Sequence, residues 1–300
     1  MPIAFFRNKS TKEVILDADV LEHIACLFDA QGADAWYSMS IEELLPEGSA
    51  YNADELEKID DILDVWFDSG STWNSVIKSG NYDAGEYPAS LYIEGSDQHR
   101  GWFQSSLLLS AAVNEVSPYK TLITHGFTVD EKGEKMSKSK GNVVAPDKVV
   151  SQYGSEILRL WVALSDYQSD LKISDGILKQ TAEQYRKIRN TFRFLLANVN
   201  DLDAYVANDA YGELDRWILT KAAEVFDSVK ANFDANDFLR GFAILNHFIT
   251  NELSGIYMDI TKDRLYCEDK NDPVRRATQS AMAHISKAML GLVAPVLTYT

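Results

Sequence analysis

Hydrophobic positions along the chain follow two periods, and the change from one to the other divides the molecule. From Asp64 to about residue 172, short apolar runs alternate with segments of helical spacing, a pattern typical of parallel α/β structure. After Asp175, apolar residues recur at every third or fourth position and no strand is indicated. The sequence therefore predicts an α/β part followed by an all-α part.

The N-terminal segment has a smaller pattern of its own. Two short strands are predicted, at Ile3–Phe6 and at Val14–Leu16, with a polar turn between them. Asp17 or Asp19 can cap the helix that follows, because an aspartate accepts from the free N–H groups of a first turn. The acidic stretch 42–64 is predicted to be a surface connection.

The α/β part is predicted from alternating strands and helices. Strands are expected at Leu91–Ile93 and Thr121–Thr124, with a helix between them over Gln98–Val116. A further helix begins at Pro146, and another spans Glu156–Leu164.

The all-α part is predicted to be a four-helix bundle. Two helices are indicated by apolar stripes over residues 185–199 and 214–233. Two more are expected over residues 236–262 and 273–293.

Composition and charge limit the classes of function. The net charge is −16, and residues 1–64 hold 15 acidic and 4 basic side chains. Nonspecific binding to nucleic acid is therefore not expected, although local basic clusters leave shape-guided binding open. No stretch is long and apolar enough to predict a membrane span. Cys26 and Cys267 lie far apart, which predicts neither a disulfide framework nor a zinc site and fits a reducing, cytoplasmic environment.

The most informative motif is a lysine-rich loop, Lys132-Gly-Glu-Lys-Met-Ser-Lys-Ser-Lys140. Its lysines alternate with the hydroxyl groups of Ser137 and Ser139, and Gly133 and Gly141 flank it as hinges. Such a loop is cationic and suited to holding a polyphosphate as negative charge builds up on it. A run of lysines and serines alone is more often a solvated surface loop, so the order of the residues has to decide.

A second group of polar residues follows the strand predicted at Leu91–Ile93. In parallel α/β structure, the turn after a strand lies at a ligand crevice, and the next helix presents free N–H groups. Gly95 allows a nucleotide to approach the backbone, Asp97 can accept from ribose hydroxyls, and Gln98 can both donate and accept. Trp102, one turn further, can form the wall of an apolar pocket. An ordinary strand–helix junction with a buried tryptophan explains these residues equally well.

The order of residues in these motifs resembles the class I aminoacyl-tRNA synthetases. Lys135-Met-Ser-Lys-Ser139 is similar to the signature loop of that class, and Gly95–Phe103 is similar to the isoleucyl-tRNA synthetase family within it. Asp64–Gly70 and Thr124–Phe127 match the same family in the same order. Tyr185–Phe194 resembles the start of its anticodon-binding domain. The valyl and leucyl relatives carry different residues around Gly95–Phe103, which argues against them.

The resemblance implies a fold and an activity. The fold is the second half of a Rossmann-like nucleotide-binding domain followed by a helical bundle. The expected parts are a small insertion or connective subdomain (1–60), the C-terminal half of the catalytic domain (61–172) and a truncated helical anticodon-binding domain (173–300). The implied activity is that of an isoleucine–tRNA ligase, which uses ATP with Mg²⁺ to form isoleucyl-adenylate and transfers isoleucine to tRNA(Ile). No obligate protein partner and no membrane are implied.

The resemblance also assigns roles to residues. Lys135 and Lys138 are the expected catalytic groups, and Trp66 and Trp102 are the expected walls of the amino-acid pocket. The residues expected to bind the aminoacyl-adenylate or ATP are Glu94, Gly95, Asp97, Gln98, His125, Gly126, Met136, Ser137 and Ser139. The residues expected to contact tRNA share one helical face and are Arg186, Arg189 and Arg193. A solvated basic face explains those arginines too.

One feature of the class is missing from this sequence. Class I synthetases carry a His-x-Gly-His element near the start of the catalytic fold, and none of the five histidines here lies in such a setting. The chain is therefore expected to be an internal piece of a longer enzyme and to be inactive by itself. The alternative is a non-catalytic RNA-binding or regulatory protein built from synthetase parts.

Overall fold

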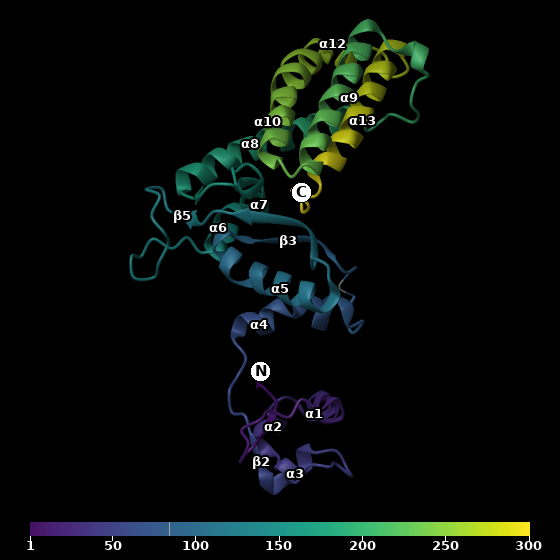
Figure 1. The fold of residues 1–300 in the computed structure, drawn as a ribbon. Coiled ribbons are helices and arrows are strands. Elements are labelled where there is room, and N and C mark those ends of the chain that lie inside the picture. The colour runs from purple at the N-terminus through teal and green to yellow at the C-terminus, as the bar shows by residue number, and fades with distance from the viewer. Residues whose placement is uncertain (84) are drawn as a thin grey trace. The chain divides into compact units, whose positions relative to one another are not determined.

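Helices dominate the computed structural model, which describes residues 1–83 and 85–300 (Figure 1). The chain separates into two compact units, residues 1–124 and 125–300, and each is described by itself. The 3₁₀- and π-helices carry the label η, with η2 and η5 being π-helices.

The elements of the first unit are β1 (Phe6–Asn8), α1 (Ala18–Gln31), α2 (Ala35–Ser38), α3 (Ile41–Leu44), η1 (Ala53–Glu55), β2 (Leu56–Lys58), α4 (Val65–Gly70), η2 (Trp73–Lys78), β3 (Ala89–Gly95), η3 (Ser96–Arg100), α5 (Trp102–Asn114) and β4 (Tyr119–His125), whose last residue begins the second unit. The second unit continues with β5 (Thr128–Val129), α6 (Pro146–Tyr153), α7 (Ser155–Ala163), β6 (Leu171–Lys172), α8 (Asp175–Val199), η4 (Asn208–Ala210), α9 (Glu213–Asp234), α10 (Phe238–His247), η5 (Phe248–Tyr257), α11 (Met258–Ile260), α12 (Lys262–Tyr266) and α13 (Pro273–Val293).

The N-terminal residues fold around a small apolar core. β1 pairs antiparallel with β2, placing Phe6 opposite Lys58, and the Phe6 ring lies 5.1 Å from that of Trp36. The strand predicted at Val14–Leu16 is wrong, because its residues form only an isolated bridge and Val14 and Leu16 stay exposed. The regular ladder of β1 is formed with β2, which brings Leu56 into the core beside Phe6.

Local signals in this segment had mixed success. The N-cap prediction is confirmed at Asp17, whose carboxylate accepts the N–H groups of Asp19 and Val20. The strand predicted at Ile3–Phe6 begins only at its last residue. The acidic stretch 42–64 is more than a connection, because it contains β2 and most of α3.

A strand–helix–strand unit forms the other half of the first unit. β3 and β4 are neighbours in one sheet, and α5 connects them. The N–H of Ala89, which begins β3, donates to the carbonyl of Pro118, which precedes β4, at 2.9 Å. The two strands therefore begin side by side, as parallel strands with a helical crossover do. Both strand predictions are confirmed, but the helix predicted over Gln98–Val116 is broken at Gly101 into η3 and α5.

A second small parallel pair lies in the second unit. Thr128 of β5 is opposite Leu171 of β6. Helices α6 and α7 pack near this pair around an apolar cluster that includes Val149, Ile157 and Trp161. The helices predicted at Pro146 and over residues 156–164 are confirmed.

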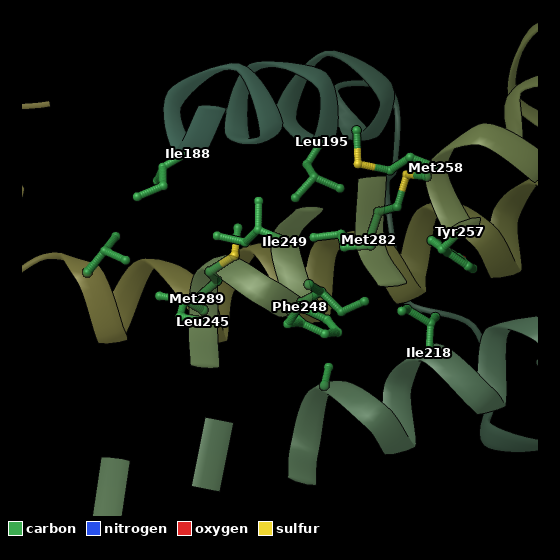
Figure 2. Packing of buried hydrophobic residues seen from close by; sticks show 14 of the residues in the cluster. Ile188, Leu195, Ile218, Leu245, Phe248, Ile249, Tyr257, Met258, Met282 and Met289 are labelled. Carbon is green, nitrogen blue, oxygen red and sulfur yellow. The ribbon is translucent and has the colours of Figure 1, made fainter. Parts of the chain in front are cut away.

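The predicted bundle is formed by α8, α9, the segment α10–α12, and α13. Figure 2 shows its core, where Leu195, Ile218, Phe248 and Met282 meet from different helices. The helix predicted over residues 236–262 is not one α-helix, because it passes through the π-helix η5. The wider turn keeps Phe248, Leu253 and Tyr257, spaced by five and four residues, buried in the same core.

Candidate functional site

The end of β3 and the turn that follows it present two exposed carboxylates, those of Glu94 and Asp97. Glu94 Oε1 accepts the N–H of Gly95 at 2.9 Å, and Asp97 Oδ2 accepts from Gln98 Nε2 at 3.3 Å. An ionised carboxylate has about four acceptor positions. The turn can therefore bind the ammonium or hydroxyl donors of a ligand, as the sequence predicts for these residues.

Gln98 also has a structural role that the sequence did not indicate. Its Oε1 accepts the N–H of Trp102, the first residue of α5, at 3.0 Å. The first N–H groups of a helix have no partner within the helix, so this side chain stabilises the start of α5. The same residue thus links the turn to the tryptophan behind it.

Both predicted pocket tryptophans lie next to Gly101. Trp102 Nε1 donates to the carbonyl of Ser69 at 3.0 Å, and its ring stacks on Tyr92 with centroids 4.3 Å apart and planes at 7°. A Cβ on Gly101 would lie 2.7 Å from Gln98 Oε1 and 3.1 Å from the ring of Trp66, so a side chain at this position would force both groups to shift. Burial raises the pKa of the Tyr92 hydroxyl, which therefore stays neutral.

A cavity of about 560 Å³ lies along β3 in the first unit. Trp102 and Tyr92 form part of its apolar wall, together with Val76 of η2, and Lys120 adds a charge. Trp66 is not among the residues that line it. Both tryptophans therefore lie at Gly101, but of the two only Trp102 lines this cavity.

In the second unit, Gly126 packs too tightly for any side chain. A Cβ at this position would lie 2.3 Å from the carbonyl oxygen of Ser169, and the Gly126 N–H donates to the carbonyl of Tyr167 at 3.0 Å. His125 Nδ1 lies 2.8 Å from the Gly126 carbonyl oxygen. The predicted His-Gly pair is thus fixed at the base of the lysine loop.

The two lysines predicted to be catalytic differ in their surroundings. Lys135 Nζ lies 3.6 Å from the ring centroid of Phe127, a cation–π contact. The side chain of Lys138 is exposed, and its ammonium group forms no hydrogen bond or ion pair with residues 1–83 or 85–300. Of the two, Lys138 therefore presents the ammonium that is ready for a ligand.

The remaining predicted residues of the loop shape it. Ser137 Oγ and Ser139 Oγ lie 3.1 Å apart, and Ser137 Oγ also accepts the N–H of Lys140 at 3.2 Å. Met136 packs against the apolar cluster below the loop, and its Sδ accepts the N–H of Val144 at 3.4 Å. Met136 thus ties the loop to the core.

The predicted basic face on α8 is exposed, as amphipathicity requires. Arg186, however, already shares its charge with Glu183, since its Nη1 donates to both carboxylate oxygens at 2.6 and 2.7 Å. Arg189 and Arg193 are exposed and have no ion pair in the described part of the chain. These two arginines are the better placed to meet an anion.

Sequence reasoning missed the side chains that support the predicted ones. They are Ser69 and Tyr92 at Trp102, Phe127 at Lys135, and Asp130 with Asn142 in the lysine loop. A signal existed for the last pair only, because Asp130 begins a turn with Gly133, and Asn142 lies three residues beyond Ser139, the last residue of the signature string.

A metal centre and a membrane span each require a particular arrangement of residues. Across residues 1–83 and 85–300, no three side chains among His, Cys, Asp and Glu converge as a metal ion requires. Over the same residues, no helix combines the length and apolar character needed to cross a bilayer.

Comparison with known proteins gives matches over most of the chain. The family model described as tRNA synthetases class I (I, L, M and V) matches residues 1–174. The model described as anticodon-binding domain of tRNA ligase matches residues 215–300.

Individual relatives match the whole chain. It is 81% identical over 300 residues to an isoleucine–tRNA ligase from a Sulfurovum species and covers 33% of that protein. It is 67% identical over 300 residues to an isoleucine–tRNA ligase from a Nitratiruptor species and covers 32% of it. The chain therefore spans about a third of the length of these relatives.

A solved structure shows the same fold. A chain from the ternary complex of Agrobacterium radiobacter K84 LeuRS with tRNA and LeuAMS superposes with a TM-score of 0.71 over 99% of this chain and 38% of that one. At 16% identity, this likeness concerns the fold alone.

Proposed function

Since the chain belongs to the class I tRNA synthetases (I, L, M and V), we propose that it is part of an enzyme that activates isoleucine with ATP and attaches it to tRNA(Ile). The predicted fold class holds, with a Rossmann-like catalytic part before a helical anticodon-binding part. The match to isoleucine–tRNA ligases along the whole chain supports isoleucine as the substrate. It also favours the ligase over a non-catalytic protein built from synthetase parts.

The lysine loop carries the proposal. In the activation step, a carboxylate oxygen of isoleucine attacks the α-phosphorus of ATP, the new O–P bond forms, and pyrophosphate leaves. Negative charge grows on the phosphate oxygens in the transition state. The exposed ammonium of Lys138 would stabilise that charge, with Ser137 and Ser139 as hydrogen-bond donors and Lys135 in support. Mg²⁺ would enter with ATP, bound mainly by its phosphates.

The turn after β3 would hold the rest of the substrate. Glu94 would accept from the α-ammonium of isoleucine, and Asp97 with Gln98 would bind the ribose and adenylate. The apolar side chain would contact Trp102, whose ring orientation is fixed by Tyr92 and Ser69. Trp66, held beside Gly101, would add to that wall.

The helical part would bind tRNA. The exposed guanidinium groups on α8, principally those of Arg189 and Arg193, would meet its backbone phosphates. In this proposal the parts of the chain are residues 1–60, 61–172 and 173–300, as the sequence predicts, and the unpaired thiols fit a cytoplasmic location.

Isoleucine-dependent ATP–pyrophosphate exchange by the full-length protein tests this function. Lys138→Ala should lower kcat by about 100-fold or more, because one preorganised positive charge in the transition state is worth that much. The KM for isoleucine should change little, since Lys138 lies on the phosphate loop.

Lys230→Ala is the matched control, because Lys230 is an exposed lysine of α9 that pairs with Asp234 of the same helix. It should exchange at the wild-type rate. Exchange that does not depend on isoleucine, or an unchanged kcat for Lys138→Ala, would contradict the proposal.

A further inference from the structure

One side-chain amide joins the two arms of the lysine loop. Asn142 Oδ1 accepts the N–H of Ser137 at 2.9 Å. Its Nδ2 donates to the carbonyl of Lys135 at 3.2 Å and to Asp130 Oδ2 at 2.9 Å. The arm that enters the loop is thus bonded to the arm that leaves it, through a residue to which the proposed chemistry gives no role.

Asp130 fixes this amide to the sheet. It follows β5 directly, and its Oδ1 accepts the N–H groups of Lys132 and Glu134 at 3.0 and 2.8 Å. With Oδ2 bonded to Asn142, both carboxylate oxygens are used. The hydrogen bond from Asn142 is the main cause that lowers the pKa of Asp130, so the carboxylate stays ionised at neutral pH.

Two further contacts fix the base of the loop. Met136 packs on the apolar cluster and bonds to the N–H of Val144, and Lys135 stacks on Phe127. The Lys138 side chain is exposed, and its ammonium group has no hydrogen bond or ion pair to the rest of the described chain. The base is therefore ordered before any ligand arrives, while the charged tip is left for one.

We propose that Asp130 and Asn142 form a latch that positions the lysine loop for the phosphates of ATP. The two are positioning residues, because they would act through the backbone of Lys135 and Ser137 and not on the substrate. A loop that is already ordered costs less conformational entropy when it closes on a ligand. This inference rests on the proposed function, since it assigns the latch to the step in which Lys138 meets the phosphates.

Loss of the latch should weaken the use of ATP and leave the use of isoleucine alone. Asn142→Ala removes all three hydrogen bonds of the side-chain amide. We therefore expect kcat/KM for ATP in pyrophosphate exchange to fall about ten-fold or more. The KM for isoleucine should stay within about two-fold, which a general loss of structure would not allow.

An exchange of the two side chains tests whether they act through each other. Asp130→Asn alone turns the NH₂ group of the new amide toward a donor, either the Asn142 NH₂ group or the backbone N–H groups of Lys132 and Glu134. Asn142→Asp alone places two carboxylates, both acceptors, next to each other. The double variant D130N/N142D restores a donor–acceptor pair and keeps an acceptor for the Ser137 N–H, although it loses the bond to the Lys135 carbonyl. Both single variants should lose ATP efficiency, and the double variant should recover most of it.

Glu134→Gln is the matched control. Glu134 pairs with Lys140 across the same loop, and both side chains are more than half exposed. Such an ion pair contributes little, so this variant should keep kcat/KM for ATP within about two-fold of the wild-type value.

Hydrogen–deuterium exchange of the peptide that spans residues 135–142 supplies a readout that needs no activity. Its amides should exchange faster in Asn142→Ala than in wild type, and the double variant should return toward wild type. If the wild-type protein shows no isoleucine-dependent ATP–pyrophosphate exchange, the proposed function fails. Hydrogen–deuterium exchange would still decide whether the latch exists. If the wild-type protein is active but the single variants keep its ATP efficiency, or the double variant recovers nothing, the latch proposal is overturned.

Discussion

Gly126 is the first residue after β4, and the close packing of its backbone explains why a side chain is excluded there. The atoms that a Cβ would meet are the carbonyl group of Ser169 and the nitrogen of Asp170, at 2.3–2.6 Å. These are backbone atoms, which cannot turn aside as a flexible side chain can. The sequence marked this glycine as a ligand-binding residue, whereas the structure adds a packing reason that operates without a ligand.

Gly126→Ala should therefore destabilise the second unit, by about 1–3 kcal/mol, because its backbone must shift to relieve the clash. Gly291→Ala is the control, since Gly291 lies in α13 with nothing within 4 Å of the added carbon. That change should be neutral or stabilising by up to about 1 kcal/mol. Urea unfolding of both variants measures the difference, and equal midpoints would contradict this account of Gly126.

Helix α8 shows at the element scale how one amphipathic segment divides packing from charge. Ile188 and Leu195 are buried in the bundle, and the arginines lie on the exposed face. The sequence treats those arginines as equivalent, but Glu183 pairs with Arg186. An arginine with its own carboxylate has to give up that contact before it binds a phosphate.

Arg189→Ala and Arg193→Ala should each weaken binding of tRNA by the full-length protein. Each should also reduce, by about 1, the slope of the logarithm of the binding constant against the logarithm of the salt concentration. A variant with one phosphate contact fewer releases fewer counterions when it binds. Arg186→Ala is the matched control and should change the slope less, since its partner is Glu183. Filter binding or fluorescence titration over a range of salt concentrations measures the slopes. Equal slopes for the three variants would mean that the pairing on α8 does not matter for binding.

At the scale of the whole molecule, an ionic network joins segments distant in the sequence. Asp201, just after α8, pairs with Arg275 of α13 at 3.0 Å and accepts from Gln279 Nε2. The Arg275 guanidinium lowers the pKa of Asp201 from 3.8 to about 2. The network therefore ties the end of one bundle helix to the first turns of another.

This pKa gives the bundle a defined acid sensitivity. The folded-state pKa lies below the unfolded one, so the stabilisation by Asp201 is complete above about pH 4 and is lost as the pH falls toward 2. Asp201→Asn should be less stable than wild type at pH 6, and the gap should narrow as the pH falls through that window. Asp227→Asn, an exposed carboxylate of α9, is the control and should follow wild type throughout. Urea unfolding at a series of pH values checks this, and a gap that stays constant from pH 6 to pH 2 would contradict it.

The sequence by itself determined what depends on residues close together in the chain. Helical period predicted the bundle, a single aspartate predicted the start of α1, and the lysine string predicted the loop and its family. Periods and caps act over three or four residues, so their physics is readable without a structure. The strands around Leu91–Ile93 and Thr121–Thr124 were found for the same reason.

Only the tertiary structure decided which distant partners each residue meets. Phe6 lies opposite Lys58 in the β1–β2 ladder and, within the described chain, has only one hydrogen bond, from the N–H of Ile15, to the segment Val14–Leu16; pairing with β2 buries Leu56 in the same core. Lys135 and Lys138 are both exposed and belong to one motif, but only Lys135 has a cation–π contact with Phe127 among the described residues. Pairing energies of this kind depend on contacts across turns and between elements, and no local period encodes them. The sequence therefore identifies the lysines, but their different surroundings follow from how the loop packs on β5 and the cluster beneath it.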